Sequence, residues 1–160
     1  MTELALHTRQ SNQVGNICDP NARTHGITAV SDDYKRRYPT AFHRSTEPTD
    51  TYNCHGLTFG ARRTRIYRPA EVRKILADDG YHEVFPPHVE PGDIIVYFDE
   101  QGDADHSGIV VEIAKRADDS ALLVPTPKVL SKWGSCHEVV HFFNDCPYSL
   151  RTIRYFRMKQ

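Results

Sequence analysis

Apolar and polar positions follow the pattern of a β-sheet in the second half of the chain. Ile94–Phe98 is a continuous apolar run behind a Pro91-Gly92-Asp93 turn, and residues 109–113 form a second apolar run after a polar loop at 99–105. Runs of this length between turn residues are typical of buried strands. Further strand segments are predicted at residues 121–124, after a turn at 115–120, at a short strand ending at 129–131, and at the alternating residues 153–157.

A helical pattern precedes these strands. Asp50-Thr51-Tyr52-Asn53 supplies side chains that cap helices, and the residues after it predict a helix from Cys54 to about Ile66. Pro69 stands at the preferred first-turn position of a second helix, which Asp79-Gly80 stops. The helical spacing rests on Leu57, Gly60, Ala61 and Thr64 in the first helix and on Val72, Ile75 and Leu76 in the second. Helices followed by strands predict an α+β fold, with N-terminal helices packed on an antiparallel sheet.

The first fifty residues show little apolar periodicity. Groups of turn formers recur there, at Asp19-Pro20-Asn21, Ser31-Asp32-Asp33 and Glu47-Pro48. We therefore expect an irregular or short-helical wrap over residues 1–50 around a catalytic core of residues 51–160. A chain of 160 residues suits a single domain.

Composition excludes some classes of partner. The formal net charge is −1, with 20 basic and 21 acidic residues, which gives no general attraction to nucleic acid or an anionic membrane. No apolar run approaches the roughly 20 residues of a membrane span. The N-terminus lacks the basic-then-apolar pattern of a secretory signal. We expect a protein made in soluble form in the cytoplasm, exported, if at all, by a route without a signal peptide. Its cysteines, Cys18, Cys54, Cys136 and Cys146, are then expected to be reduced.

Cys54 opens the first predicted helix. A thiol attacks as the thiolate, and a free cysteine is only a few per cent ionised at neutral pH. Backbone N–H groups at a helix N-terminus lower the pKa of a thiol. We interpret Cys54 as a nucleophile whose amide donates to an oxyanion, Asn53 as a cap or second donor, and Gly56 as a position where a substrate approaches closely. The competing interpretation makes Cys54 a small buried apolar residue.

His106 follows the polar loop and starts the strand that contains residues 109–113. Its ring is therefore expected at the sheet edge, facing the helix end, within about 4 Å of the Cys54 sulfur. A thiolate–imidazolium pair also needs a third group that holds the ring in the correct tautomer.

Three segments together resemble the NlpC-type cysteine peptidases of the papain-like superfamily. They are Asn53-Cys54-His55-Gly56, Pro91-Gly92-Asp93-Ile94-Ile95-Val96-Tyr97 and His106-Ser107-Gly108-Ile109-Val110-Val111, within a matching region of residues 52–134. These enzymes cleave amide bonds in bacterial cell-wall peptides. The resemblance implies a papain-like core in which Cys54 attacks the carbonyl and His106 passes a proton to the leaving amine. It departs at the cysteine, where Asn53 and His55-Gly56 replace the usual Asp and Ser-Gly.

The third role has two candidates. Ser131-Lys132-Trp133-Gly134 resembles the Asn-Ser-Trp-Gly run of papain-like peptidases, in which the Asn orients the base and the Trp shields that contact. Ser131 stands at the Asn position, so the resemblance assigns it the orienting role. His141 is the alternative, because many NlpC-type enzymes use a second histidine.

The resemblance predicts a peptide or peptidoglycan-like substrate and no cofactor, in an exported antibacterial toxin or a phage-encoded enzyme. A toxin would have an immunity protein as its partner. A cytoplasmic deamidase, a transglutaminase-like enzyme or a small-peptide hydrolase fits the same residues. The alternative from a different class is a catalytically silent binding module on the same fold. No metal is expected, because the group Cys136, His137, His141 and Cys146 matches no common zinc spacing.

Overall fold

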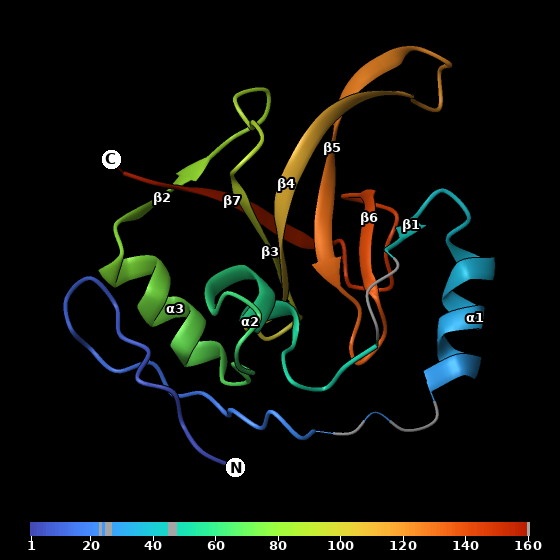
Figure 1. Ribbon diagram of the computed structural model, residues 1–160. Coiled ribbons are helices and arrows are strands. Elements are labelled where there is room, and N and C mark those ends of the chain that lie inside the picture. Colours follow the sequence, from blue (N-terminus) through green and yellow to red (C-terminus); the bar gives the residue numbers. More distant parts are fainter. Residues whose placement is uncertain (23, 25–26, 45–47, 160) are drawn as a thin grey trace.

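The computed structural model describes residues 1–22, 24, 27–44 and 48–159. Within them the chain forms an α+β fold around a seven-stranded antiparallel sheet, in the order β1-β6-β5-β4-β3-β7-β2 (Figure 1). The strands are β1 (Phe42–His43), β2 (Tyr81–Val84), β3 (Ile94–Phe98), β4 (Ala104–Ala117), β5 (Leu123–Lys132), β6 (Glu138–Phe142) and β7 (Thr152–Met158). The predicted α+β class and antiparallel sheet are confirmed.

Three helices flank the sheet: α1 (Ile27–Arg37), α2 (Cys54–Phe59) and α3 (Pro69–Asp78). None of the helices in the described ranges is long and apolar enough to cross a membrane. The predicted α3 is confirmed with its first-turn proline. The predicted helix from Cys54 to Ile66 is wrong in extent. It ends at Phe59 because Ala61 and Arg62 adopt positive φ values of 50° and 63°, which turn the chain back.

The two faces of the sheet carry separate apolar cores, because successive strand residues point to opposite sides. Ile95 and Tyr97 of β3 belong to a cluster that includes Trp133 and against which Tyr34 of α1 packs. Ile94 and Val96 belong to a second cluster with residues of α3. We call these the α1 face and the α3 face. α2 lies on the α3 face, where it contacts β4 and β5 (Figure 1).

β4 and β5 form a long hairpin that extends beyond the neighbouring strands (Figure 1). The sequence predicted two short strand segments, at 121–124 and ending at 129–131, where the structure has one strand, β5. In the structure Pro125 and Pro127 pair with β4, while β5 pairs with β6 only from Lys128 onward. Pro125 and Pro127 lie where no strand of the described residues pairs with the side of β5 that faces away from β4, so their missing N–H groups cost no hydrogen bond of the sheet. The strand therefore continues through both prolines.

The first fifty residues are more ordered than predicted. Ser31-Asp32-Asp33, expected as a turn, lies inside α1, and β1 adds an edge strand beside β6. The turn at Asp19-Pro20-Asn21 is confirmed by a hydrogen bond from the amide of Asn21 to Asp19 Oδ1. Glu47 of the third expected turn lies outside the described residues. Because β1 belongs to the sheet, no structural division separates residues 1–50 from the rest.

Candidate active site at the start of helix α2

Asn53 fixes the position of the first turn of α2. Its Oδ1 accepts hydrogen bonds from the amides of Gly56 (2.9 Å) and Ile66 (3.1 Å), and its Nδ2 donates to the Ile66 carbonyl (2.8 Å). These bonds cap the helix and attach the returning chain to it. Since both ends of the amide are occupied, Asn53 is a structural cap, and the interpretation as an oxyanion donor is not supported.

Gly56 is explained by chain packing. A Cβ atom built on Gly56 would lie 1.8 Å from the carbonyl oxygen of Thr64. The missing side chain therefore makes room for the returning segment after α2, and not for a substrate as predicted.

His55 joins α2 to the start of β4. It is 3% exposed, with Nε2 at 3.2 Å from the Ala104 carbonyl and Nδ1 at 2.8 Å from Ser107 Oγ. Burial lowers the pKa of His55 to about 4, so the ring is neutral near pH 7. A carbonyl can only accept, so Nε2 carries the proton of the neutral ring, while Nδ1 lies against the Ser107 hydroxyl, which also bonds Thr58 Oγ1 at 3.0 Å. The sequence analysis gave His55 no role.

The Cys54 thiol lies against the β4 segment that contains His106. Burial raises the pKa of this thiol to about 11, and the backbone N–H groups of Ser107, His55 and Cys54 only partly offset that rise. The N–H groups of the first turn do face the sulfur, as the sequence predicted. The prediction that these N–H groups give the thiol a lowered pKa is wrong. Part of the Cys54 residue is exposed, but the sulfur itself is removed from water, and this raises the pKa.

His106 is fully buried, and neither of its ring nitrogens has a hydrogen-bond partner among the described residues, Cys54 included. It pairs with Tyr97 across the β3–β4 ladder, which places its side chain on the α1 face. Burial holds the pKa of His106 well below its ordinary value. No hydrogen bond joins His106 to Cys54 in this state, and the expected separation of about 4 Å between the ring and the sulfur stays a prediction.

Tyr148 packs on His106 and lies within electrostatic range of Cys54. Its ring stacks on that of His106, with centroids 3.5 Å apart and planes 7° from parallel. Burial raises the pKa of Tyr148, and the nearby Cys54 raises it further. Sequence reasoning missed Tyr148, because it stands in an irregular segment with no periodic signal.

Ser131 does not contact His106 in the predicted way. It lies at 2.9 Å from His141 Nε2, while His141 Nδ1 lies 2.7 Å from the Phe142 carbonyl and therefore carries the proton. Ser131 and His141 are diagonal neighbours on β5 and β6, on the α1 face, so their side chains meet each other first. Trp133 is fully buried against Tyr34 of α1 and Tyr38, which follows that helix, and it belongs to the core.

A buried charge cluster on β5 and β6 was also missed. Lys132 is 1% exposed, and its ammonium donates to the carbonyls of Gly134 (2.7 Å) and Cys136 (3.1 Å). Burial lowers the pKa of Lys132 to about 8, which nearby acidic groups and Cys54 partly counteract. Glu138 opposite it, also 1% exposed, accepts from Tyr52, Arg62 and Arg44. A strand pattern gives no signal for such residues, because charged side chains normally indicate an exposed face.

A pocket of about 260 Å³ opens beside Cys54. Asp99, Asp103 and Asp105 give its lining an acidic character, and Tyr67 and Pro69 are among its apolar walls. Asp103 is paired with Arg73 at 2.6 Å. The pKa of Asp105 is raised by burial and by the charge of Asp99. The pocket therefore favours a positively charged group next to the thiol.

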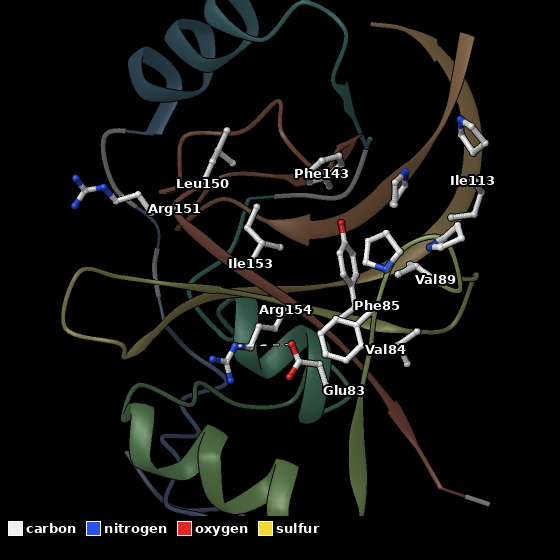
Figure 2. Close-up of a pocket in the computed structure, with 15 residues that line it drawn as sticks. Glu83, Val84, Phe85, Val89, Ile113, Phe143, Leu150, Arg151, Ile153 and Arg154 are labelled. Carbon is white, nitrogen blue, oxygen red and sulfur yellow. Dashed lines mark ion pairs between the residues drawn. The ribbon is translucent and has the colours of Figure 1, made fainter. Parts of the chain in front are cut away.

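The largest hollow lies elsewhere. Figure 2 shows a pocket of about 630 Å³ on the α1 face, lined mainly by apolar side chains such as Phe85, Ile113 and Phe143. Arg154 and Glu83 form an ion pair at its rim (Figure 2). None of the residues lining it belongs to the Cys54 pocket.

No group of three or more His, Cys, Asp or Glu side chains in the described part of the chain is placed to hold a metal ion, the Cys136–Cys146 region included. The described cysteines are all free.

Comparison with known proteins gives no assignment: no protein-family model, curated protein or solved structure matches this chain. The resemblance to NlpC-type peptidases therefore rests on the residues quoted above.

Proposed function

We propose that the protein is a cysteine-dependent amide hydrolase with a papain-like core, in which Cys54 is the nucleophile and His106 the base. One observation carries this proposal. A buried histidine whose two ring nitrogens have no partner among the described residues stacks on Tyr148, and the β4 residue next to it, Ser107, directs its backbone N–H at the Cys54 thiol at a helix start. Each unpartnered buried polar group costs about 1–3 kcal/mol, and such costs are characteristic of functional sites.

In the proposed reaction the Cys54 thiol gives its proton to His106, and the sulfur attacks the carbonyl carbon of the substrate amide. The Cys54 amide, which faces the sulfur, donates to the oxyanion of the tetrahedral intermediate. Collapse breaks the C–N bond, and His106 transfers its proton to the leaving amine. Water, deprotonated by His106, then hydrolyses the thioester and regenerates the thiol.

In the substrate-free state both partners are neutral, because burial raises the pKa of Cys54 to about 11 and holds that of His106 far below its ordinary value. The ion pair therefore forms only together with substrate binding. Because the His106 side chain is on the α1 face and α2 on the α3 face, the reaction needs a rearrangement at the start of β4 that brings the ring and the thiol together.

A peptide amide with a nearby protonated amine fits this site best. The acidic lining of the Cys54 pocket supports the positive charge, and the resemblance to NlpC-type enzymes supports a cell-wall peptide. Deamidation and acyl transfer use the same residues and differ in their products. Peptide hydrolysis releases a carboxylate and a peptide amine, deamidation releases a carboxylate and ammonia, and acyl transfer joins the acyl group to a second amine.

The test is the release of new amino groups from peptidoglycan-derived peptides, compared among the unchanged protein, Cys54→Ala and Cys18→Ala. Cys18 is a matched control, since it is also partly exposed. We expect release by the unchanged protein and by Cys18→Ala, and none by Cys54→Ala. Full release by Cys54→Ala would require another nucleophile.

A second candidate is a catalytically silent binding module, which the large apolar pocket on the α1 face favours, because it lies apart from the thiol (Figure 2). If the protein is such a binding module, substitution of Cys54 should not change binding of its partner. The protein should also form no covalent acyl adduct with amide or ester substrates.

A further inference from the structure

A second polar pocket lies along one side of α1, from Thr24 before its first turn to Lys35 in its last turn, away from Cys54. It has a volume of about 370 Å³. Its lining comes from three parts of the chain: α1 with the residue Thr24 before it, the segment at Pro48, and the loop between β5 and β6. The lining residues are Thr24, Ile27, Thr28, Ser31, Asp32, Lys35, Pro48 and His137, none of which lines the Cys54 pocket.

Three buried polar atoms of this lining have no hydrogen-bond partner within the described ranges. They are Thr24 Oγ1, Ser31 Oγ and His137 Nδ1. Ser31 is only 3% exposed, so its hydroxyl does not find water at the surface. Such an atom loses its hydration without gaining a hydrogen bond when it stays unsatisfied. Three in one pocket, two from the α1 region and one from the loop between β5 and β6, indicate groups arranged for a ligand.

The charge distribution favours an anion. Ile27 and Thr28 are the first residues of the 11-residue α1, whose first turn has no acidic side chain, and a helix N-terminus attracts negative charge. Lys35 adds an ammonium group. His137, on the loop between β5 and β6, lines the same pocket as Lys35.

Asp32 is the opposing charge in this pocket. Its carboxylate is 4.0 Å from the Lys35 ammonium, and the two side chains are 65% and 50% exposed. An ion pair this long and this exposed contributes little, so a buried anion competes successfully for Lys35.

We propose that this pocket binds a tetrahedral oxyanion, such as the phosphoryl group of a small phosphorylated molecule. The hydroxyls of Thr24 and Ser31, the His137 ring and the Lys35 ammonium approach the pocket from different segments, which suits the several oxygens of a tetrahedral anion better than a planar carboxylate. The pocket has room for an organic group attached to the phosphate.

Calorimetric titration of the full chain with inorganic phosphate tests the proposal. The test variants are Lys35→Gln and Ser31→Ala. The matched control is Arg36→Gln, because Arg36 is an exposed charge on the same helix and its side chain pairs with Asp33 outside the pocket. We expect saturable binding that weakens at least about tenfold in Lys35→Gln and measurably in Ser31→Ala, with Arg36→Gln unchanged. Sulfate should compete with phosphate, and acetate should compete poorly.

The absence of saturable phosphate binding, or equal weakening by Arg36→Gln and Lys35→Gln, would overturn the proposal. The half-exposed Lys35 and Arg36 can be replaced without disturbing the core, so the comparison does not depend on the buried Ser31→Ala variant. Titration of Cys54→Ala should give unchanged phosphate binding, which separates this site from the proposed hydrolase.

Discussion

Burial at Cys54 outweighs the helix start in setting the charge of the thiol. The N–H groups that face the sulfur lower the pKa of the thiol, yet removal from water raises it to about 11. His106 shows the same effect with opposite sign, because burial disfavours its protonated form. Cys54 and His106 are therefore both neutral near pH 7 in this state.

Alkylation of Cys54 should therefore be slow at pH 6 and accelerate about tenfold per pH unit between pH 7 and 10, since the thiolate fraction rises toward a pKa of about 11. Mass spectrometry of the Cys54 peptide after timed exposure to iodoacetamide measures this rate. A rate at pH 6 equal to that at pH 9 would reveal a preformed ion pair and contradict the neutral resting state.

Ser131 and His141 should behave as one unit. Because the hydroxyl of Ser131 donates to His141 Nε2, removing either side chain leaves the other unpaired. We expect Ser131→Ala and His141→Ala each to lower the free energy of unfolding by about 1–3 kcal/mol, with a double variant well short of the sum. Urea denaturation measures all three. Additive losses would show that the two side chains act independently.

The sequence located the thiol and the histidine but not their neighbours. Cys54 and His106 stand at the starts of a helix and of a strand, and such boundaries are visible as changes in periodicity. Tyr148 and Lys132 are brought to the site by long-range packing, which no local pattern records. The role of Ser131 was transferred from a resemblance, and the diagonal pairing of β5 with β6 directs it to His141 instead.

At the scale of elements, α2 is short and depends on its surroundings. Its six residues are held by Asn53 at the front and by His55 against β4. An isolated helix of this length is unstable in water. The position of the thiol is therefore set by these side-chain bonds more than by helix propensity.

Asn53→Ala should lower the free energy of unfolding by about 2–4 kcal/mol, because it removes a cap and leaves the Ile66 amide and carbonyl without their partner. Asn53→Asp keeps both accepted bonds and should lose about half as much. Asn21→Ala, at an exposed turn, is the control and should change stability by less than about 0.5 kcal/mol. Chemical denaturation measures the series, and an Asn53→Ala loss no larger than the Asn21→Ala loss would refute this role.

At the scale of the whole molecule, the α+β class and the C-terminal strands were predictable, because continuous apolar runs mark buried strands. β2 and β6 were not predicted. Their sequences, Tyr81–Val84 and Glu138–Phe142, mix charged and apolar residues, since β6 carries Glu138 into a buried ion cluster. β5 contains two prolines and remains one strand because of how its residues pair with β4 and β6. That pairing is set only when the whole sheet is assembled, so the local sequence does not reveal it.

Acidification should destabilise the fold well above the range where carboxylates titrate. His55, His106 and His141 are buried, and each has a pKa lowered by burial. Below about pH 6.5 the unfolded chain takes up protons at these positions and the folded chain does not, so stability falls as pH falls.

The three residues together give a slope of up to about 4 kcal/mol per pH unit between pH 6 and 5. His55→Asn should reduce the slope by about a third. Urea unfolding at pH 7, 6 and 5 measures this slope, and stability that stays constant over that range would contradict the assignment of three neutral buried rings.

The central claim, that Cys54 and His106 form one catalytic unit, is tested most directly by a double-mutant cycle of kcat/KM on a cleaved peptide. Cys54→Ala, His106→Ala and the double variant are compared, with thermal unfolding to confirm that each is folded. We predict that each single variant falls to background and that the double variant loses nothing more. Substantial activity in a folded His106→Ala variant, or losses that multiply, would contradict the account.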